Sequence, residues 1–192
     1  MFFNMMKKCR SFRKFDNSIA VSENDLAKIM ECVRFAPTGG NQQNLRFFLN
    51  NDKSVNEKIF AQTKWAALYR DWEPAESERP SAYIFICTPK HLEARRAWLK
   101  LDVGIAAQTI MLSASNLGLG GCILGSFNEK NLLDEFNLGE AYHIELVVAI
   151  GKPNEIVVWE DAKSAADLAY YRDDNGIHHV PKLTAEDLII NK

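Results

Sequence analysis

Residues 97–127 read AWLKLDVGIAAQTIMLSASNLGLGGCILGSF, and the rest of the chain can be arranged around this stretch. Apolar residues recur at helical spacing over its first two thirds, and further apolar side chains fill the remaining sides. A helix that is apolar nearly all round is usually buried on every face, in a core or against a second subunit. Gly118 follows the last apolar turn, as a helix that stops on a left-handed residue requires. The pattern therefore predicts a long buried helix that ends near Gly118.

The end of the same stretch changes character. Cys122, Ile123 and Leu124 form a short apolar run between glycines, which is typical of a buried strand. After it, Gly125 and Ser126 can bring bare backbone N–H groups close to a ligand, because glycine has no side chain to hold one off. An ordinary core helix, turn and core strand would give the same pattern, so this stretch alone leaves both interpretations open.

The composition limits the class of protein. The chain has 192 residues and a net charge of −2, from 23 basic and 25 acidic residues, which argues against nucleic acid or an anionic membrane as a main partner. Cys9, Cys32, Cys87 and Cys122 are scattered without metal-ligand spacing and indicate reduced thiols. No stretch approaches ~18 uninterrupted apolar residues. We therefore expect a cytoplasmic, single-domain protein with no metal site and no membrane or nucleic-acid partner.

Strand and helix patterns alternate along the rest of the chain. Ser22 can cap a helix whose first turn is acidic, and residues 144–150, IELVVAI, are the strongest strand signal. The tail, residues 154–192, is too polar to form a hydrophobic core of its own, so we expect it to lie along the surface or on a partner. In it, His178 and His179 are expected to be exposed rather than metal ligands. Further strands are expected at residues 45–50 and 82–88, and further helices at 55–63 and 129–136.

Two segments outside the central stretch carry candidate ligand-binding groups. Arg10, Ser11 and Arg13 offer two guanidinium groups and a hydroxyl, the donors that a phosphate dianion needs, although a solvated basic stretch would look the same. The loop at residues 38–44 offers side-chain amides beside two glycines, for a heterocycle edge or a polyol, although an ordinary loop after a helix would also fit.

Residues 64–80 mix aromatic side chains with charges and prolines and predict a lid or a surface loop. Trp65 and Tyr69 would form an aromatic wall over a ligand; packing of this loop onto its own core explains them about as well.

Several of these motifs, in this order, carry a resemblance that none carries alone. They are R-S-x-R-x-F at residues 10–15, A-P-T-G-G-N-x-Q at 36–43, L-D-x-G-x-A-A-Q at 101–108, G-L-G-G-C-x-x-G at 118–125 and L-V-V-A-I-G-K-P at 146–153. The chain resembles the FMN-dependent nitroreductase family, NAD(P)H-using flavin enzymes built as intertwined homodimers. The likeness extends to V-P-K at residues 180–182.

The resemblance implies an α+β fold, in which helices flank a small, mostly antiparallel central sheet and FMN lies between two subunits. The polar tail, residues 154–192, would be an arm that wraps the partner. By likeness, Arg10, Ser11 and Lys182 would contact the phosphate of FMN, and Arg13 the ribityl chain or the pyrimidine edge. The other expected cofactor-binding residues are Gly125 and Ser126 near N5 of the flavin and, from the other subunit, Pro37, Thr38, Gly39, Asn41 and Gln43.

The reaction implied is transfer of hydride from NAD(P)H through N5 of FMN to a flat acceptor, such as a nitroaromatic or a quinone. No catalytic side chain is expected, because the flavin carries the reactivity. One alternative is a protein that stores or senses FMN with little turnover, and another is the same fold with a different reductive activity, such as dehalogenation. The family often has further basic residues where this chain has Cys9 and Leu183, so the phosphate would meet fewer charges here.

Overall fold

The expected long helix is present in the computed structural model, which describes residues 2–69 and 72–190. Helix α4, Arg96–Asn116, has 21 residues and is followed by Gly118 at φ +73°, which confirms the predicted left-handed stop. Residues 70–71 of the expected lid and 191–192 of the expected arm, like Met1, lie outside the described residues.

A five-stranded antiparallel sheet lies under α4. Its centre is β5, Tyr142–Pro153, which pairs with β3, Ala82–Pro89, and β3 pairs in turn with β2, Arg46–Asn50. On its other side β5 pairs with β4, Gly120–Leu124, and with the two-residue β1, Phe15–Asp16. The antiparallel sheet and the strand predicted after Gly118 are therefore confirmed.

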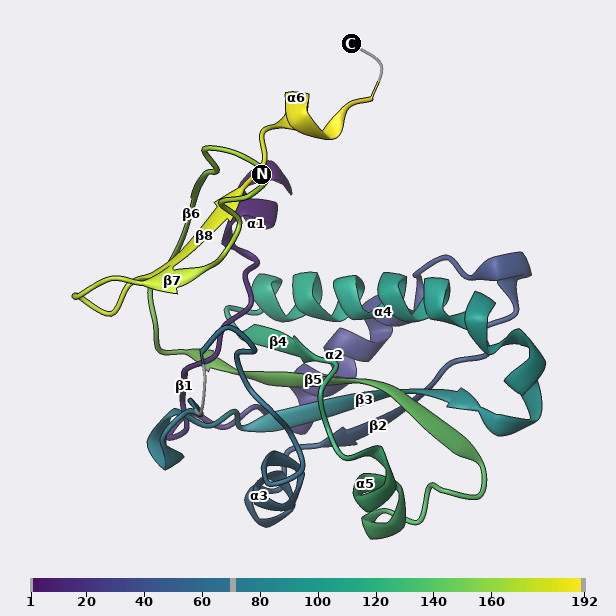
Figure 1. The fold of residues 1–192 in the computed structure, drawn as a ribbon. Coiled ribbons are helices and arrows are strands. Elements are labelled where there is room, and N and C mark those ends of the chain that lie inside the picture. The colour runs from purple at the N-terminus through teal and green to yellow at the C-terminus, as the bar shows by residue number, and fades with distance from the viewer. Residues whose placement is uncertain (1, 70–71, 191–192) are drawn as a thin grey trace.

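Helices cover both faces of this sheet (Figure 1). Helices α2, Glu23–Arg34, and α4 lie on one face, and α3, Lys53–Phe60, and α5, Glu129–Glu135, lie on the other. Alternate residues of a strand point to opposite faces, so Ile84 and Ile86 enter the core under α2 and α4, while Tyr83 and Phe85 enter the other core. This arrangement is the α+β architecture expected from the sequence.

Short elements connect or extend these layers. They are α1, Phe2–Lys8; three 3-10 helices at Gly39–Asn41, Glu76–Glu78 and Lys90–Arg95; β6, Val157–Asp161; β7, Tyr171–Arg172; β8, His178–Lys182; and α6, Ala185–Leu188. Strand β8 pairs in parallel with β6 and antiparallel with β7. The polar tail thus forms a small sheet beside α1, where the Lys7 ammonium lies 5.1 Å from the ring centre of Trp159 (Figure 1).

Helix α4 is buried on one side only within a single chain. Val103, Ile110 and other residues on its inner side are buried, but Trp98 is 72% exposed and Leu101 62% exposed. The sheet lies on one side of the helix only, so a single chain cannot bury α4 on every face. The second possibility, a further subunit against this helix, is not tested by one chain. Within the described residues, no helix is both long and apolar enough to cross a membrane.

Candidate functional site

The N-terminal basic segment lies against the edge of β4. Ser11 forms a parallel bridge with Gly121, whose carbonyl accepts a hydrogen bond of 2.9 Å from the Phe12 N–H. A Cβ atom on the neighbouring Gly120 would stand 2.5 Å from the Phe12 ring, so only glycine permits this approach. The glycines before Cys122 therefore serve to position the R-S-x-R motif.

Behind this segment lies a cavity of about 320 Å³, here called the basic pocket. Three segments that are far apart in the sequence line it: the R-S-x-R motif, the C-terminal half of α4 with Ile123, and the arm. Its lining contains four of the predicted site residues, and none of the described residues that line it is acidic. The lining residues are Cys9, Arg10, Ser11, Arg13, Gln108, Met111, Ile123, Tyr170, His178, Val180 and Lys182.

The two arginines of the pocket are held differently. Arg10 donates from Nη2 to the Met6 carbonyl at 2.6 Å, and its buried Nε has no hydrogen-bond partner among the described residues. Arg13 donates from Nη1 to Nε2 of His178 at 3.0 Å, and its guanidinium lies 4.5 Å from the centre of the Tyr170 ring. A buried donor without a partner is costly, so the free Nε of Arg10 fits a site that receives an anion.

His178 corrects the expectation of an exposed tail histidine. It is fully buried on β8, and burial, helped by the charge of Arg13, lowers its pKa to about 4. The ring is therefore neutral at pH 7, with Nε2 accepting from Arg13 and Nδ1 carrying the proton. That proton faces the Tyr69 hydroxyl, 3.1 Å from Nδ1. The sequence analysis missed this histidine because nothing local distinguishes it from His179.

The loop at residues 38–44, here called the amide loop, lies elsewhere. Asn41 and Gln43 adopt left-handed backbone angles, with φ of +53° and +48°, and the Gln43 N–H donates to Oγ1 of Thr38 at 3.2 Å. The Gly39 N–H donates to Oδ1 of Asp102 on α4 at 3.0 Å. Pro37, Thr38 and Gln43 line a second cavity of about 270 Å³ together with Asp102.

The structure does not bring the amide loop to the basic pocket of the same chain. Asp102 and Ala106 of α4 line the cavity at the loop, whereas Gln108 and Met111 line the basic pocket, and no residue lines both. Figure 1 shows the chain after α2 reaching the N-terminal end of α4, while the arm lies toward its other end. The two groups of predicted residues are therefore separate within one subunit.

The remaining predicted site residues lie in three different environments. Gly125 and Ser126 are exposed after β4, and the space that a Cβ on Gly125 would occupy is open. Tyr69 approaches the basic pocket through its contact with His178. Trp65 does not form an aromatic wall: it is 6% exposed and stacks on Phe60 in the core, with ring centres 5.9 Å apart. For Trp65, packing of the loop onto its own core is the correct interpretation.

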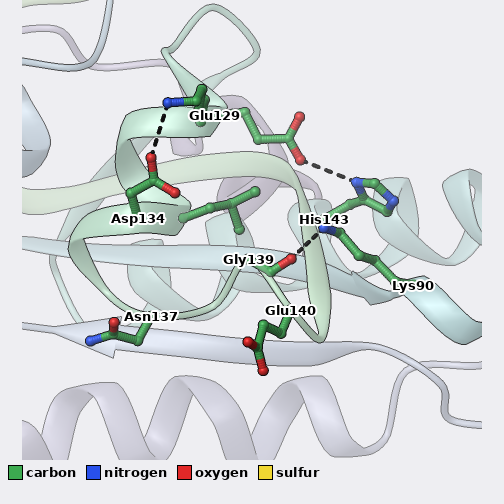
Figure 2. A pocket seen from close by; sticks show the side chains of 9 residues that line it. Lys90, Glu129, Asp134, Asn137, Gly139, Glu140 and His143 are labelled. Carbon is green, nitrogen blue, oxygen red and sulfur yellow. Dashed lines mark hydrogen bonds and ion pairs between the residues drawn. The ribbon is translucent and has the colours of Figure 1, made fainter.

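A larger cavity, of about 770 Å³, lies beside α5 and contains none of the predicted site residues. Polar side chains there pair with one another. Nδ1 of His143 lies 3.4 Å from the Glu129 carboxylate (Figure 2), and Nζ of Lys130 lies 3.2 Å from the Asp134 carboxylate. Lys90 donates to the Gly139 carbonyl. Among the described residues, no group of three metal-ligating side chains was found. This groove has the character of a solvated surface.

Comparisons with known proteins agree with the fold described above. A structure described as an FMN-dependent nitroreductase from Clostridium difficile R20291 is 24% identical, with a TM-score of 0.65 over 86% of this chain and 94% of that one. A protein with the provisional name nitroreductase, solved in complex with FMN, from Desulfovibrio desulfuricans, has a TM-score of 0.69 at 21% identity over 99% of this chain and 95% of that one.

Among curated sequences, a protein of Archaeoglobus fulgidus with the provisional name NADH dehydrogenase/NAD(P)H nitroreductase is 25% identical over 152 residues, which cover 76% of this chain and 82% of the relative. The model of the nitroreductase family matches residues 6–152, which include the R-S-x-R motif, the amide loop, α4 and the central sheet. The chain therefore belongs to the nitroreductase family.

Proposed function

We propose that this chain is an FMN-dependent oxidoreductase that works as a homodimer in the cytoplasm, taking hydride from NAD(P)H and passing it to a flat acceptor such as a nitroaromatic or a quinone. Membership of the nitroreductase family supports the class of enzyme. The named relative supports NAD(P)H as donor, and the neighbour in complex with FMN supports the cofactor. Four free thiols are in keeping with a reducing compartment.

The observation that carries the proposal is the donor set of the basic pocket. Arg10, Ser11 and Lys182 meet there from opposite ends of the chain. Among the described residues, the lining holds no carboxylate and the buried Nε of Arg10 has no hydrogen-bond partner. These groups fit the phosphate of FMN, which needs charge-assisted donors. Arg13 is assigned to the ribityl chain or the pyrimidine edge, where its charge favours a negatively charged ring.

No protein acid or base is required in this proposal. When bound, FMN supplies a hydride acceptor and donor, so the chain has to bind, orient and shield it. His178 holds the Arg13 guanidinium in place through Nε2, and it stays neutral at pH 7 because its pKa is about 4. Gly125 and Ser126 are assigned to backbone contact with N5, and the open space at Gly125 is compatible with that role.

The dimer completes the proposed site. The amide loop lies apart from the basic pocket of its own chain, so Pro37, Thr38, Gly39, Asn41 and Gln43 are assigned to the flavin held by a partner copy. The exposed apolar stripe of Trp98, Leu101 and Ile105 on α4 offers a surface for that partner. The arm, residues 154–192, is assigned to the same contact.

A second candidate function is FMN binding with little catalytic turnover. Cys9 lines the basic pocket where the family often has a basic residue, and burial raises the pKa of its thiol, so this position is neutral at pH 7. A pocket with fewer charges would suit a protein that stores or senses FMN. A third candidate is another reductive activity on the same fold, such as dehalogenation.

The proposal is tested by titrating the purified chain with FMN, with riboflavin as a matched ligand that lacks the phosphate. We expect FMN to bind, riboflavin to bind much more weakly, and the loaded protein to oxidise NADH or NADPH when a quinone or a nitroaromatic is added. Bound flavin with no NAD(P)H oxidation would favour storage or sensing. Absence of FMN binding at micromolar concentration would contradict the proposal.

A further inference from the structure

Asp102 is a buried carboxylate that the proposed flavin contacts do not use. Asp102 lies on the buried side of α4, next to Val103, and is only 7% exposed. Burying a charge is costly unless hydrogen bonds compensate for it. Within residues 2–69 and 72–190, the hydrogen bond found for this carboxylate is to the backbone N–H of Gly39, 3.0 Å from Oδ1.

The loop that Asp102 contacts has a backbone that needs support. Asn41 and Gln43 have positive φ angles although neither is a glycine, and Gly40 between Gly39 and Asn41 has φ +59°. Such angles persist only where the surroundings hold them, and they cluster at functional sites. Hydrogen bonds from the N–H groups of Asn41 and Gln43 to Thr38 tie the loop to itself. The bond to Asp102 ties the loop to α4.

We propose that Asp102 is a positioning residue: its Oδ1 holds the Gly39 peptide and thereby keeps the amide loop in the shape that contacts the partner subunit's flavin. This inference rests on the proposed function. The role needs an acceptor at Oδ1 rather than a negative charge. Asp102 acts through the loop, because its carboxylate lies at the loop cavity and not at the basic pocket.

Asp102→Ala and Asp102→Asn separate these properties, since asparagine keeps an acceptor oxygen at the same place and loses the charge. We expect Asp102→Ala to weaken FMN binding about tenfold or more, because a charged acceptor is lost. Asp102→Asn should stay within about threefold of wild type, because a neutral acceptor retains about half of such a bond. Ser113→Ala is the matched control: Ser113 is a buried polar residue of α4 whose hydroxyl donates to the Thr109 carbonyl of its own helix at 2.7 Å.

The experiment measures amide hydrogen exchange across residues 38–44 without FMN, together with FMN titration by flavin fluorescence. We expect faster exchange in Asp102→Ala and near-wild-type exchange in Asp102→Asn and Ser113→Ala. Unchanged loop exchange or unchanged FMN affinity in Asp102→Ala would overturn the inference, and so would an Asp102→Asn protein as impaired as Asp102→Ala. If the wild-type chain binds no FMN, the proposed function fails, and the exchange data still decide whether Asp102 holds the loop.

Discussion

The basic pocket and the amide loop are built in opposite ways. The pocket joins residues near both termini with the C-terminal half of α4, and its groups meet only because the chain folds. The loop is one continuous segment that bonds mostly to itself and to Arg46, which closely follows it. Its hydrogen bond to α4 is made through Asp102, toward the other end of that helix. One chain therefore presents the two groups to different places, and a single flavin can use both only if they come from two copies.

The largest expected effect comes from disrupting the proposed dimer. Leu101→Glu places a charge in the exposed apolar stripe of α4, where the side chain is 62% exposed, so the isolated chain should tolerate it. An unpaired charge buried in an interface costs several kcal/mol, so we expect a monomer and at least about a 100-fold loss of FMN affinity. Analytical ultracentrifugation and FMN titration measure the two effects.

Ile19→Glu is the control for Leu101→Glu, because Ile19 is 42% exposed and lies outside α4. It should leave both the oligomeric state and FMN binding as in wild type. A Leu101→Glu protein that is monomeric and still binds FMN tightly would show that one chain suffices for the site.

The next test acts on the pocket alone. Arg10→Ala removes the guanidinium whose Nε lacks a partner, and we expect FMN binding to weaken about ten- to a hundredfold, since hydrogen bonds to charged groups contribute about 1.5–3 kcal/mol. Lys7→Ala makes the same change in charge nearby, but the Lys7 ammonium lies over the Phe3 and Trp159 rings. Lys7→Ala should change the affinity less than about twofold. Equal losses in both variants would mean that general charge, not Arg10, holds the phosphate.

The same contrast explains what could be predicted from the sequence. The strands and helices follow from local periodicity, and Gly118 and the capping Ser22 mark helix ends whose geometry is local. His178 was missed, because its burial depends on Arg13 and Tyr69, which lie more than 100 residues away in the chain. The exposed side of α4 was not separable from its buried side, since both are apolar. Residues that meet through the tertiary fold leave no local signal.

Gly120 offers a test of how the pocket is assembled. Gly120→Ala would put a Cβ 2.5 Å from the Phe12 ring and 2.6 Å from Pro153, so the R-S-x-R segment must shift. Overpacking of this kind costs about 1–3 kcal/mol, and we expect the Tm to fall by about 3–10 °C. Gly139→Ala, whose Cβ would have an ordinary contact of 3.6 Å, should leave the Tm nearly unchanged. Thermal denaturation of the two variants without FMN compares them, and an unchanged Tm in Gly120→Ala would contradict the close packing.

The smallest expected effect is on the pH dependence of stability. The neighbouring histidines His178 and His179 of the arm have pKa shifts of opposite direction. Burial, then the charge of Arg13, lowers the pKa of His178 to about 4, below its ordinary value of 6.5. As the pH falls below 6.5, His178 therefore binds a proton in the unfolded chain, but in the folded chain it binds one only near pH 4. His178 thus lowers the stability of the fold progressively as the pH falls through this window.

His179, next to His178, has the opposite sign. Burial lowers the pKa of its ring, but hydrogen bonds to Glu160 and Asp173 outweigh burial and raise it. The stability that His179 contributes is complete below its unfolded pKa and is lost as the pH rises through its folded pKa. Between pH 7 and pH 4.5, His178→Gln should therefore lose less stability than wild type, and His179→Gln should lose more. Differences from wild type in Tm against pH, measured without FMN, cancel the other titrating groups. If Tm changes with pH in the same way in wild type and His178→Gln, His178 is not buried as a neutral ring. Its place in the lining of the basic pocket would then have to be assigned to another residue.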